Sequence, residues 1–202
     1  MVRQNRKETE YQDAHYHVDI KGIEGINIFT DDRNKNKFLY YLQKMSNLYK
    51  VQIFSYVLMD THYHLLLKTE KPNLSQSIQF VNSSYAHWCN TKHIRKGHIF
   101  QDRYKSYLII NTLYLYSIAS YISLNPVEAG LVNSPEEYTW SSFRFLFPSQ
   151  VKNIPTWLRI QEFLQLCQTN SNNFINFVKE NCQKNNFRDV FKNSINDSPR
   201  KM

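Results

Sequence analysis

Ser55-Tyr-Val-Leu-Met-Asp-Thr-His-Tyr-His-Leu-Leu-Leu-Lys68 is the stretch that decides the fold of this chain. Aromatic, β-branched and leucine residues dominate it, which is typical of β-strands, and Asp60-Thr61 interrupts them. The sequence therefore predicts a hairpin of two strands, 51–59 and 62–68. Residues two apart on a strand face the same side at about 7 Å, so His62 and His64 would stand together. Such a pair can hold a metal ion, but a half-buried strand that carries two histidines by chance has the same pattern.

The segments around the hairpin predict an α+β fold. Apolar spacing indicates a strand, two helices, a further strand and a third helix, at 14–20, 31–49, 73–88, 103–110 and 113–124. The third helix is expected to stop at Asn125-Pro126, because the residue before a proline resists the α region. The first six elements follow the order β-α-β-β-α-β, which is that of a ferredoxin-like antiparallel sheet with helices on one face. The third helix would then cross the open face, toward which the histidine pair would point.

Composition sets the size and the setting of the protein. The 202 residues suffice for one domain, expected at 1–145, and a composition shift near 148–155 predicts a helical C-terminal extension at 146–202. The three cysteines form no CxxC pair, which favours free thiols in a reducing compartment. No apolar run approaches the length of a membrane span, and the N-terminus is polar, so a cytoplasmic location is expected.

The positive charge is concentrated after the histidine pair. The net charge is +8, and residues 61–110 hold seven Lys and Arg against two acids. Basic side chains neutralise phosphates and aromatic faces stack on unpaired bases, so this mixture predicts a contact with single-stranded nucleic acid. A solvated loop before an ordinary strand fits the same composition. The candidate DNA-binding residues are Lys92, Arg95, Lys96, Phe100, Arg103, Tyr104 and Lys105.

Two further features leave alternatives open. A second His-x-His, His15 and His17 on the first strand, competes with the hairpin pair for the metal role. On the third helix, Tyr121 and Asn125 are four apart and are therefore neighbours on its surface. Taken alone, a helical tyrosine is usually a packing residue and an Asn before Pro is usually a helix stop.

Four motifs occur in order along the chain. They are Tyr56-Val-Leu-Met-x-x-His-x-His-Leu-Leu-Leu67, Gly97-x-x-Phe-Gln-x-Arg103, Tyr121-Ile-x-x-Asn-Pro-Val-x-Ala-Gly-Leu-Val132 and Tyr138-x-Trp-Ser-Ser142. Together they resemble the single-tyrosine HUH transposases, and most closely the REP-associated tyrosine transposases. The resemblance covers roughly residues 15–143, and the first-strand segment His17-Val-x-x-Lys-Gly22 is similar to that family as well. Thr61 and Asp60 depart from the family pattern, in which Asn and Pro are common at these positions.

The resemblance implies a role for each matching position. His62, His64 and Asn125 would bind Mg²⁺ or Mn²⁺, and Tyr121 would attack DNA and form a 5′-phosphotyrosine. The implied partner is single-stranded DNA that carries hairpins such as REP-like palindromes, and the protein would act as a monomer or a homodimer. Positive charge near the phenol would help it to ionise, since the pKa of tyrosine in water is about 10. Tyr114 and Tyr116 are competing nucleophiles on the same predicted helix.

Two rival functions remain open on sequence alone. One is a domesticated relative that grips structured single strands without cutting them. The other is a zinc-dependent hydrolase of small molecules that uses one of the two histidine pairs, although no carboxylate stands at a recognisable ligand spacing.

Overall fold

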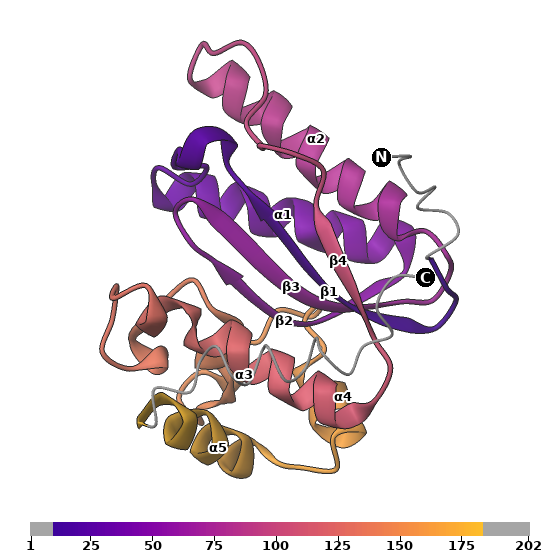
Figure 1. The fold of residues 1–202 in the computed structure, drawn as a ribbon, viewed down its shortest axis with the longest axis vertical. Coiled ribbons are helices and arrows are strands. Elements are labelled where there is room, and N and C mark those ends of the chain that lie inside the picture. Colours follow the sequence, from indigo (N-terminus) through magenta and orange to yellow (C-terminus); the bar gives the residue numbers. More distant parts are fainter. Residues whose placement is uncertain (1–9, 184–202) are drawn as a thin grey trace.

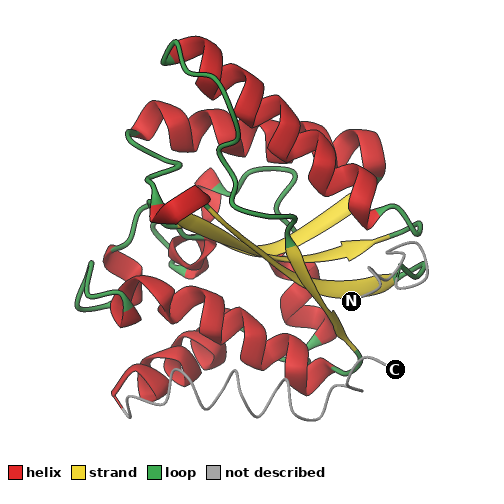
Figure 2. Ribbon diagram, turned by 45° about the horizontal axis from the view of Figure 1, so that its top comes forward, coloured by secondary structure: helices red, strands yellow, loops and turns green. Residues whose placement is uncertain are grey.

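A four-stranded antiparallel sheet with helices on both faces forms the body of the molecule (Figures 1 and 2). The computed structural model describes residues 10–183. Residues 1–9 and 184–202 lie outside it, and the latter range is part of the predicted C-terminal extension. The strand order is β2-β3-β1-β4, and the elements follow the order β-α-β-β-α-β before α3. The predicted α+β, ferredoxin-like arrangement is therefore confirmed. The strands are β1 (Ala14–Lys21), β2 (Val51–Leu58), β3 (His62–Thr69) and β4 (Lys105–Ile109).

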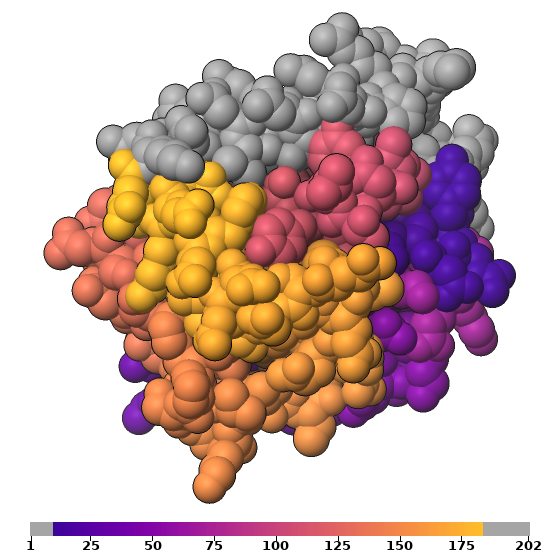
Figure 3. All heavy atoms as spheres, turned by 90° about the horizontal axis from the view of Figure 1, so that it is seen from below, coloured from indigo at the N-terminus to yellow at the C-terminus, as the bar shows by residue number. Residues whose placement is uncertain are grey.

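The helices form two layers. In Figure 1, α1 (Asp32–Tyr49) and α2 (Leu74–Lys92) lie above the sheet, and α3 (Thr112–Glu128) lies below it. The extension adds α4 (Ile160–Leu166) and α5 (Ser171–Gln183) on the side of α3, as Figure 3 shows in orange and yellow. Its side chains join the same hydrophobic core: the ring of Tyr116 on α3 lies 4.6 Å from that of Phe177 and 5.0 Å from that of Phe174. Helix α3 is thus held between the sheet and the extension.

The prediction that the third helix stops at Asn125-Pro126 is wrong, because α3 continues through Pro126 to Glu128. Two residues beyond the end of α3, Gly130 has a φ of 67°, which lies in the left-handed region. The N–H of Leu131 donates to the carbonyl of Pro126 at 2.9 Å, and that of Gly130 donates to Val127 at 2.9 Å. This is the Schellman pattern, which satisfies the last carbonyls of a helix. A proline inside a helix removes one hydrogen bond, and here the later stop leaves Asn125 within a regular turn of α3.

The β2–β3 turn is fixed by an ion pair from α1. Lys35 is 8% exposed and its Nζ lies 2.8 Å from Oδ1 of Asp60. The same ammonium group lies 5.7 Å from the ring centroid of Trp140 and 5.9 Å from that of Tyr138. Because Asp60 directly precedes Thr61 and His62, these contacts set where β3 begins.

Replacing Lys35 with methionine should therefore destabilise the protein. The stem is kept while the ion pair and the cation–π contacts are lost, and we expect the free energy of unfolding to fall by about 1–2 kcal/mol. Urea unfolding followed by circular dichroism measures this change. The exposed Lys152 gives the control, since Lys152→Met should leave the urea midpoint unchanged.

Candidate metal and nucleophile site

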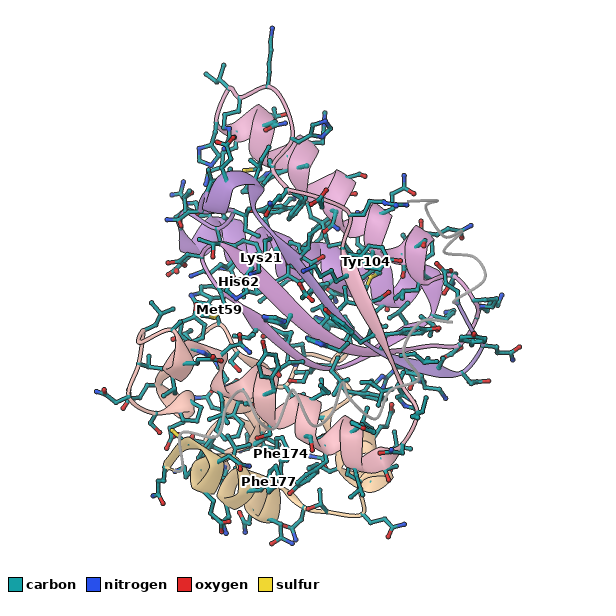
Figure 4. All side chains as sticks on the ribbon, viewed as in Figure 1. Lys21, Met59, His62, Tyr104, Phe174 and Phe177 are labelled. Atoms are coloured by element: carbon teal, nitrogen blue, oxygen red, sulfur yellow. The ribbon has the colours of Figure 1, made fainter. Side chains whose placement is uncertain are left out.

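The two histidines of β3 lie side by side on the face of the sheet that α3 covers. Their ring centroids are 5.2 Å apart, with the rings nearly perpendicular at 88°. His64 is buried and His62 is half-buried. In Figure 4 His62 lies at one end of the sheet beside Lys21, its partner across the β1–β3 ladder. The predicted pairing of the two imidazoles is thus present in the structure.

Helix α3 brings Tyr121 and Asn125 to this pair. The ring centroid of Tyr121 lies 5.6 Å from that of His64, in an edge-on orientation. Nδ2 of Asn125 donates to the carbonyl of Tyr121 at 2.8 Å. A carbonyl only accepts hydrogen bonds, so this contact fixes which end of the amide faces the helix and leaves Oδ1 for other partners. The Asn125 amide also acts on both imidazoles, because its polar contact opposes the lowering of their pKa values by burial.

A third imidazole, His17 of β1, adjoins the pair. Its Nε2 lies 3.0 Å from Nδ1 of His64, and its ring stacks on that of His64 at 5.2 Å. Nδ1 of His62 is engaged in the same way, at 3.0 Å from Oγ1 of Thr61. Nε2 is therefore the nitrogen of each β3 histidine that is available to a metal ion.

The two histidines of the second His-x-His have different surroundings. His15 lies opposite Lys68 in the β1–β3 ladder, well along the strand from His64, which lies opposite Asp19. The His15 ring stacks on Phe54, with centroids 5.6 Å apart. His15 thus packs against a core residue, whereas His17 contacts His64.

Burial keeps the three imidazoles neutral. It lowers the pKa of His17 to about 3 and that of His64 well below its ordinary value. It also lowers the pKa of His62, assisted by Lys21, while the hydrogen bond to Asn125 acts in the opposite direction. A neutral imidazole is the form that binds metal ions. The site therefore needs no deprotonation at neutral pH before a cation can bind.

The candidate ligands for a metal ion are the two β3 imidazoles and the amide oxygen of Asn125. Across residues 10–183 no group of three or more His, Cys, Asp or Glu side chains is arranged to hold a metal ion. The zinc-hydrolase alternative draws on those residue types, so the described part of the chain gives it no support. Two imidazole nitrogens with the amide oxygen of Asn125 fit a divalent cation of intermediate softness.

The surroundings of Tyr121 hold its phenol in the protonated form. Burial raises its pKa to about 12, Glu128 and Asp19 add to this effect, and the hydrogen bond to Asn125 opposes it. Nearby positive charge was expected to lower the pKa of Tyr121. The side chains that contribute to its shift are acidic or uncharged, so they do not supply that charge. A phenol with such a pKa remains neutral at pH 7 until another charge is brought close.

The competing tyrosines of α3 lie elsewhere. Tyr116 packs against Phe174 and Phe177 of α5, which Figure 4 shows on the far side of α3 from His62. Tyr114 precedes Tyr121 by seven residues, about 10 Å along a helix. Of these three tyrosines, Tyr121 is the one whose ring contacts the histidines.

The candidate DNA-binding residues divide into two groups. Arg95, Lys96 and Arg103 are exposed in the α2–β4 loop, and Lys105 is exposed at the start of β4. Lys92 is tied to Asp31 by an ion pair of 2.7 Å. All five remain candidates for phosphate contacts.

The expectation that both aromatic rings of this segment stack on bases is wrong for Tyr104. Its side chain is 6% exposed and its hydroxyl group lies 2.9 Å from that of Ser75 on α2. Phe100 is half-buried and packs toward Tyr63 and Tyr85. The segment that leads into β4 runs along α2 (Figure 1), which directs Tyr104 and Phe100 toward residues of α2 instead of solvent.

Sequence reasoning missed several residues of the site. Asp19, 9% exposed, lies opposite His64 on one side and Lys105 on the other. The Tyr107 ring stacks on His17 at 5.6 Å. Alternation along β1 places 17 and 19 on one face, but only the register between β1 and β3 shows that this face meets His64.

Comparison with known proteins identifies the family. Residues 10–125 match the model of the family described as "Transposase IS200 like". A solved structure described as a REP-associated tyrosine transposase bound to a REP hairpin matches with a TM-score of 0.61 and 17% identity, over 71% of this chain and 82% of that one. The tRNA(His) guanylyltransferase of Saccharomyces cerevisiae matches with a TM-score of 0.34 and 18% identity, over 81% of each chain, which is too weak to carry an argument.

The remaining comparisons add little to this result. No curated protein gives a significant match. Among the described helices none is long and apolar enough to cross a membrane. The family match spans more than half of the chain and includes β1, the histidine hairpin, Tyr121 and Asn125. The chain therefore belongs to the IS200-like transposase family and has the fold of a REP-associated tyrosine transposase.

Proposed function

We propose that this protein is a metal-dependent transposase that cleaves and rejoins single-stranded DNA next to hairpins through Tyr121. The observation that carries the proposal is the convergence of the Tyr121 ring, the two β3 imidazoles and the Asn125 amide on one buried face. The family assignment supports transposition as the process in which this cleavage takes part. The hairpin in the related structure supports DNA hairpins as the partner class.

The residues of this chain divide the work of cleavage. Nε2 of His62, Nε2 of His64 and Oδ1 of Asn125 would hold a divalent cation, which supplies charge stabilisation for a phosphate oxygen. Helix α3 holds the Tyr121 phenol beside these ligands. Its oxygen attacks phosphorus and loses its proton as the bond from phosphorus to the 3′ oxygen breaks, and that oxygen leaves as a 3′-hydroxyl group.

The product of this step explains how strands are rejoined. The 5′ phosphate stays linked to Tyr121 as a phosphodiester, so the free energy of the broken bond is kept. Attack by another 3′-hydroxyl group on the phosphotyrosine then restores a DNA linkage and returns the phenol. Rejoining therefore needs no nucleoside triphosphate.

The proposal is tested with labelled DNA that carries a hairpin and a single-stranded flank. With Mn²⁺ we expect an adduct that survives SDS and is lost on protease treatment, together with a released strand that ends in a 3′-hydroxyl group. Hairpin binding with no adduct under any divalent cation would instead identify a non-cleaving binding protein.

The ligand types predict a preference for Mn²⁺. Imidazole nitrogens suit Mn²⁺ better than Mg²⁺, which prefers oxygen ligands. At matched, sub-saturating concentrations we expect adducts to form several-fold faster with Mn²⁺ than with Mg²⁺. Initial rates across a titration of each cation measure the difference. Equal half-saturating concentrations for the two ions would contradict the proposed ligand set.

A further inference from the structure

The outer face of α1 and α2 carries a cluster of lysines and aromatic rings that the site does not use. We call it the basic helical face and define it as Lys37, Tyr40, Tyr41 and Lys44 of α1 with Trp88 and Lys92 of α2. These helices cover the side of the sheet opposite α3 (Figure 1). We infer that the basic helical face binds the phosphate backbone of the DNA hairpin whose single-stranded flank reaches Tyr121. This inference rests on the proposed function.

Charge is the first reason. After Asp32 no acid occurs until Asp60, and none occurs between Glu70 and Asp102. Helix α2 therefore has no acid, and the acids of the α1 end are Asp31 and Asp32, of which Asp31 is paired with Lys92. A surface of one sign over two packed helices attracts a polyanion and gives binding that weakens with salt.

The second reason is that aromatic rings hold the lysines in place. Nζ of Lys37 lies 4.5 Å from the ring centroid of Tyr40 and 5.2 Å from that of Tyr41. Nζ of Lys44 lies 4.9 Å from Tyr40, and Nζ of Lys92 lies 5.2 Å from Trp88. Cation–π contacts restrict these otherwise flexible side chains. Less conformational entropy is then lost when the ammonium groups meet phosphates.

The third reason is a basic path from this face to the site. Helix α2 ends at Lys92, and the following loop carries the exposed side chains of Arg95, Lys96 and Arg103. That loop is hydrogen-bonded to the end of β1: Ile23 N donates to Ile99 O at 2.9 Å, and Gln101 N donates to Lys21 O at 3.0 Å. Lys21 lies opposite His62. A DNA arm on the helices can therefore pass its flank around the ends of β1 and β3 to the histidines.

A duplex arm fits this face better than a bare single strand does. Tyr40 is 42% exposed, and the faces of the rings are occupied by ammonium groups. The cluster thus presents positive charges on fixed side chains instead of open ring faces for base stacking. Phosphate contacts of this kind position a duplex without reading its sequence.

The test compares two charge reversals on the full chain, with fluorescent probes that consist of a hairpin with its flank, the hairpin alone, and the flank alone. Lys44→Glu should weaken binding of both hairpin probes roughly tenfold at low salt and reduce the salt slope by about one. Lys152→Glu, the same change on an exposed residue outside the two helices, should have little effect. Tyr40→Leu, which keeps all lysines, should weaken hairpin binding by a smaller factor.

Each outcome decides the inference separately from the nuclease proposal. Equal effects of Lys44→Glu and Lys152→Glu would overturn it, as would a loss confined to the flank probe. If Lys44→Glu weakens hairpin binding but the wild type forms no adduct, the surface assignment stands and the nuclease proposal fails. If the wild type forms adducts and Lys44→Glu binds hairpins normally, only the surface assignment fails.

Discussion

Tyr121→Phe should abolish the covalent DNA adduct and leave hairpin affinity within about twofold of the wild-type value. The substitution removes one oxygen atom and keeps the ring that lies 5.6 Å from His64 and 5.9 Å from His17. The neighbours of the ring are therefore retained, and the missing atom is the proposed nucleophile. The measurement pairs an SDS gel for adducts with a binding titration on the same protein preparation.

The other tyrosines of α3 provide the controls. Tyr114→Phe and Tyr116→Phe should both retain adduct formation, since Tyr116 packs against α5 and Tyr114 lies two turns away. Adducts that persist in Tyr121→Phe and vanish in one of these variants would assign the nucleophile to that residue. Loss of hairpin affinity in Tyr121→Phe would show that the phenol binds DNA before it reacts.

The parts of the site that local periodicity controls could be predicted from the sequence. A period of two places His62 beside His64, and a period of 3.6 places Tyr121 beside Asn125. The element order was sufficient for the ferredoxin-like fold and for a third helix on the open face. In each case the decisive contact lies within one element or follows from the order of elements.

Contacts between elements that are distant in sequence could not be predicted in this way. The place of His17 depends on the β1–β3 register, which pairs Asp19 with His64. The basic residues around Tyr104 predict an exposed ring. The ring is buried instead, because its segment runs along α2. The position of the helix stop depends on Gly130 more than on Pro126, since the left-handed residue closes the hydrogen-bond pattern of α3.

The contact between His17 and His64 has a consequence for metal binding. In the metal-free site, Nε2 of His17 and Nδ1 of His64 lie 3.0 Å apart, so one of the two nitrogens donates to the other. A cation at Nε2 of His64 requires a lone pair there, which places the proton of the neutral ring on Nδ1. Nδ1 then donates to Nε2 of His17, so His17 must be the acceptor when the cation is bound. A neutral imidazole can do so by exchanging its tautomers.

His17→Leu should therefore weaken Mn²⁺ binding roughly 10–100-fold, because the Nδ1–H of His64 would be buried without an acceptor. His17→Gln should retain most of the affinity, since an amide can either donate or accept at this position. Isothermal titration with Mn²⁺ in the absence of DNA measures the affinity, and thermal unfolding of the metal-free proteins separates it from stability. If both variants lose affinity in proportion to their loss of stability, His17 is a packing residue. Rescue by glutamine alone, at equal stability of the two variants, identifies it as the residue that positions His64 for the cation.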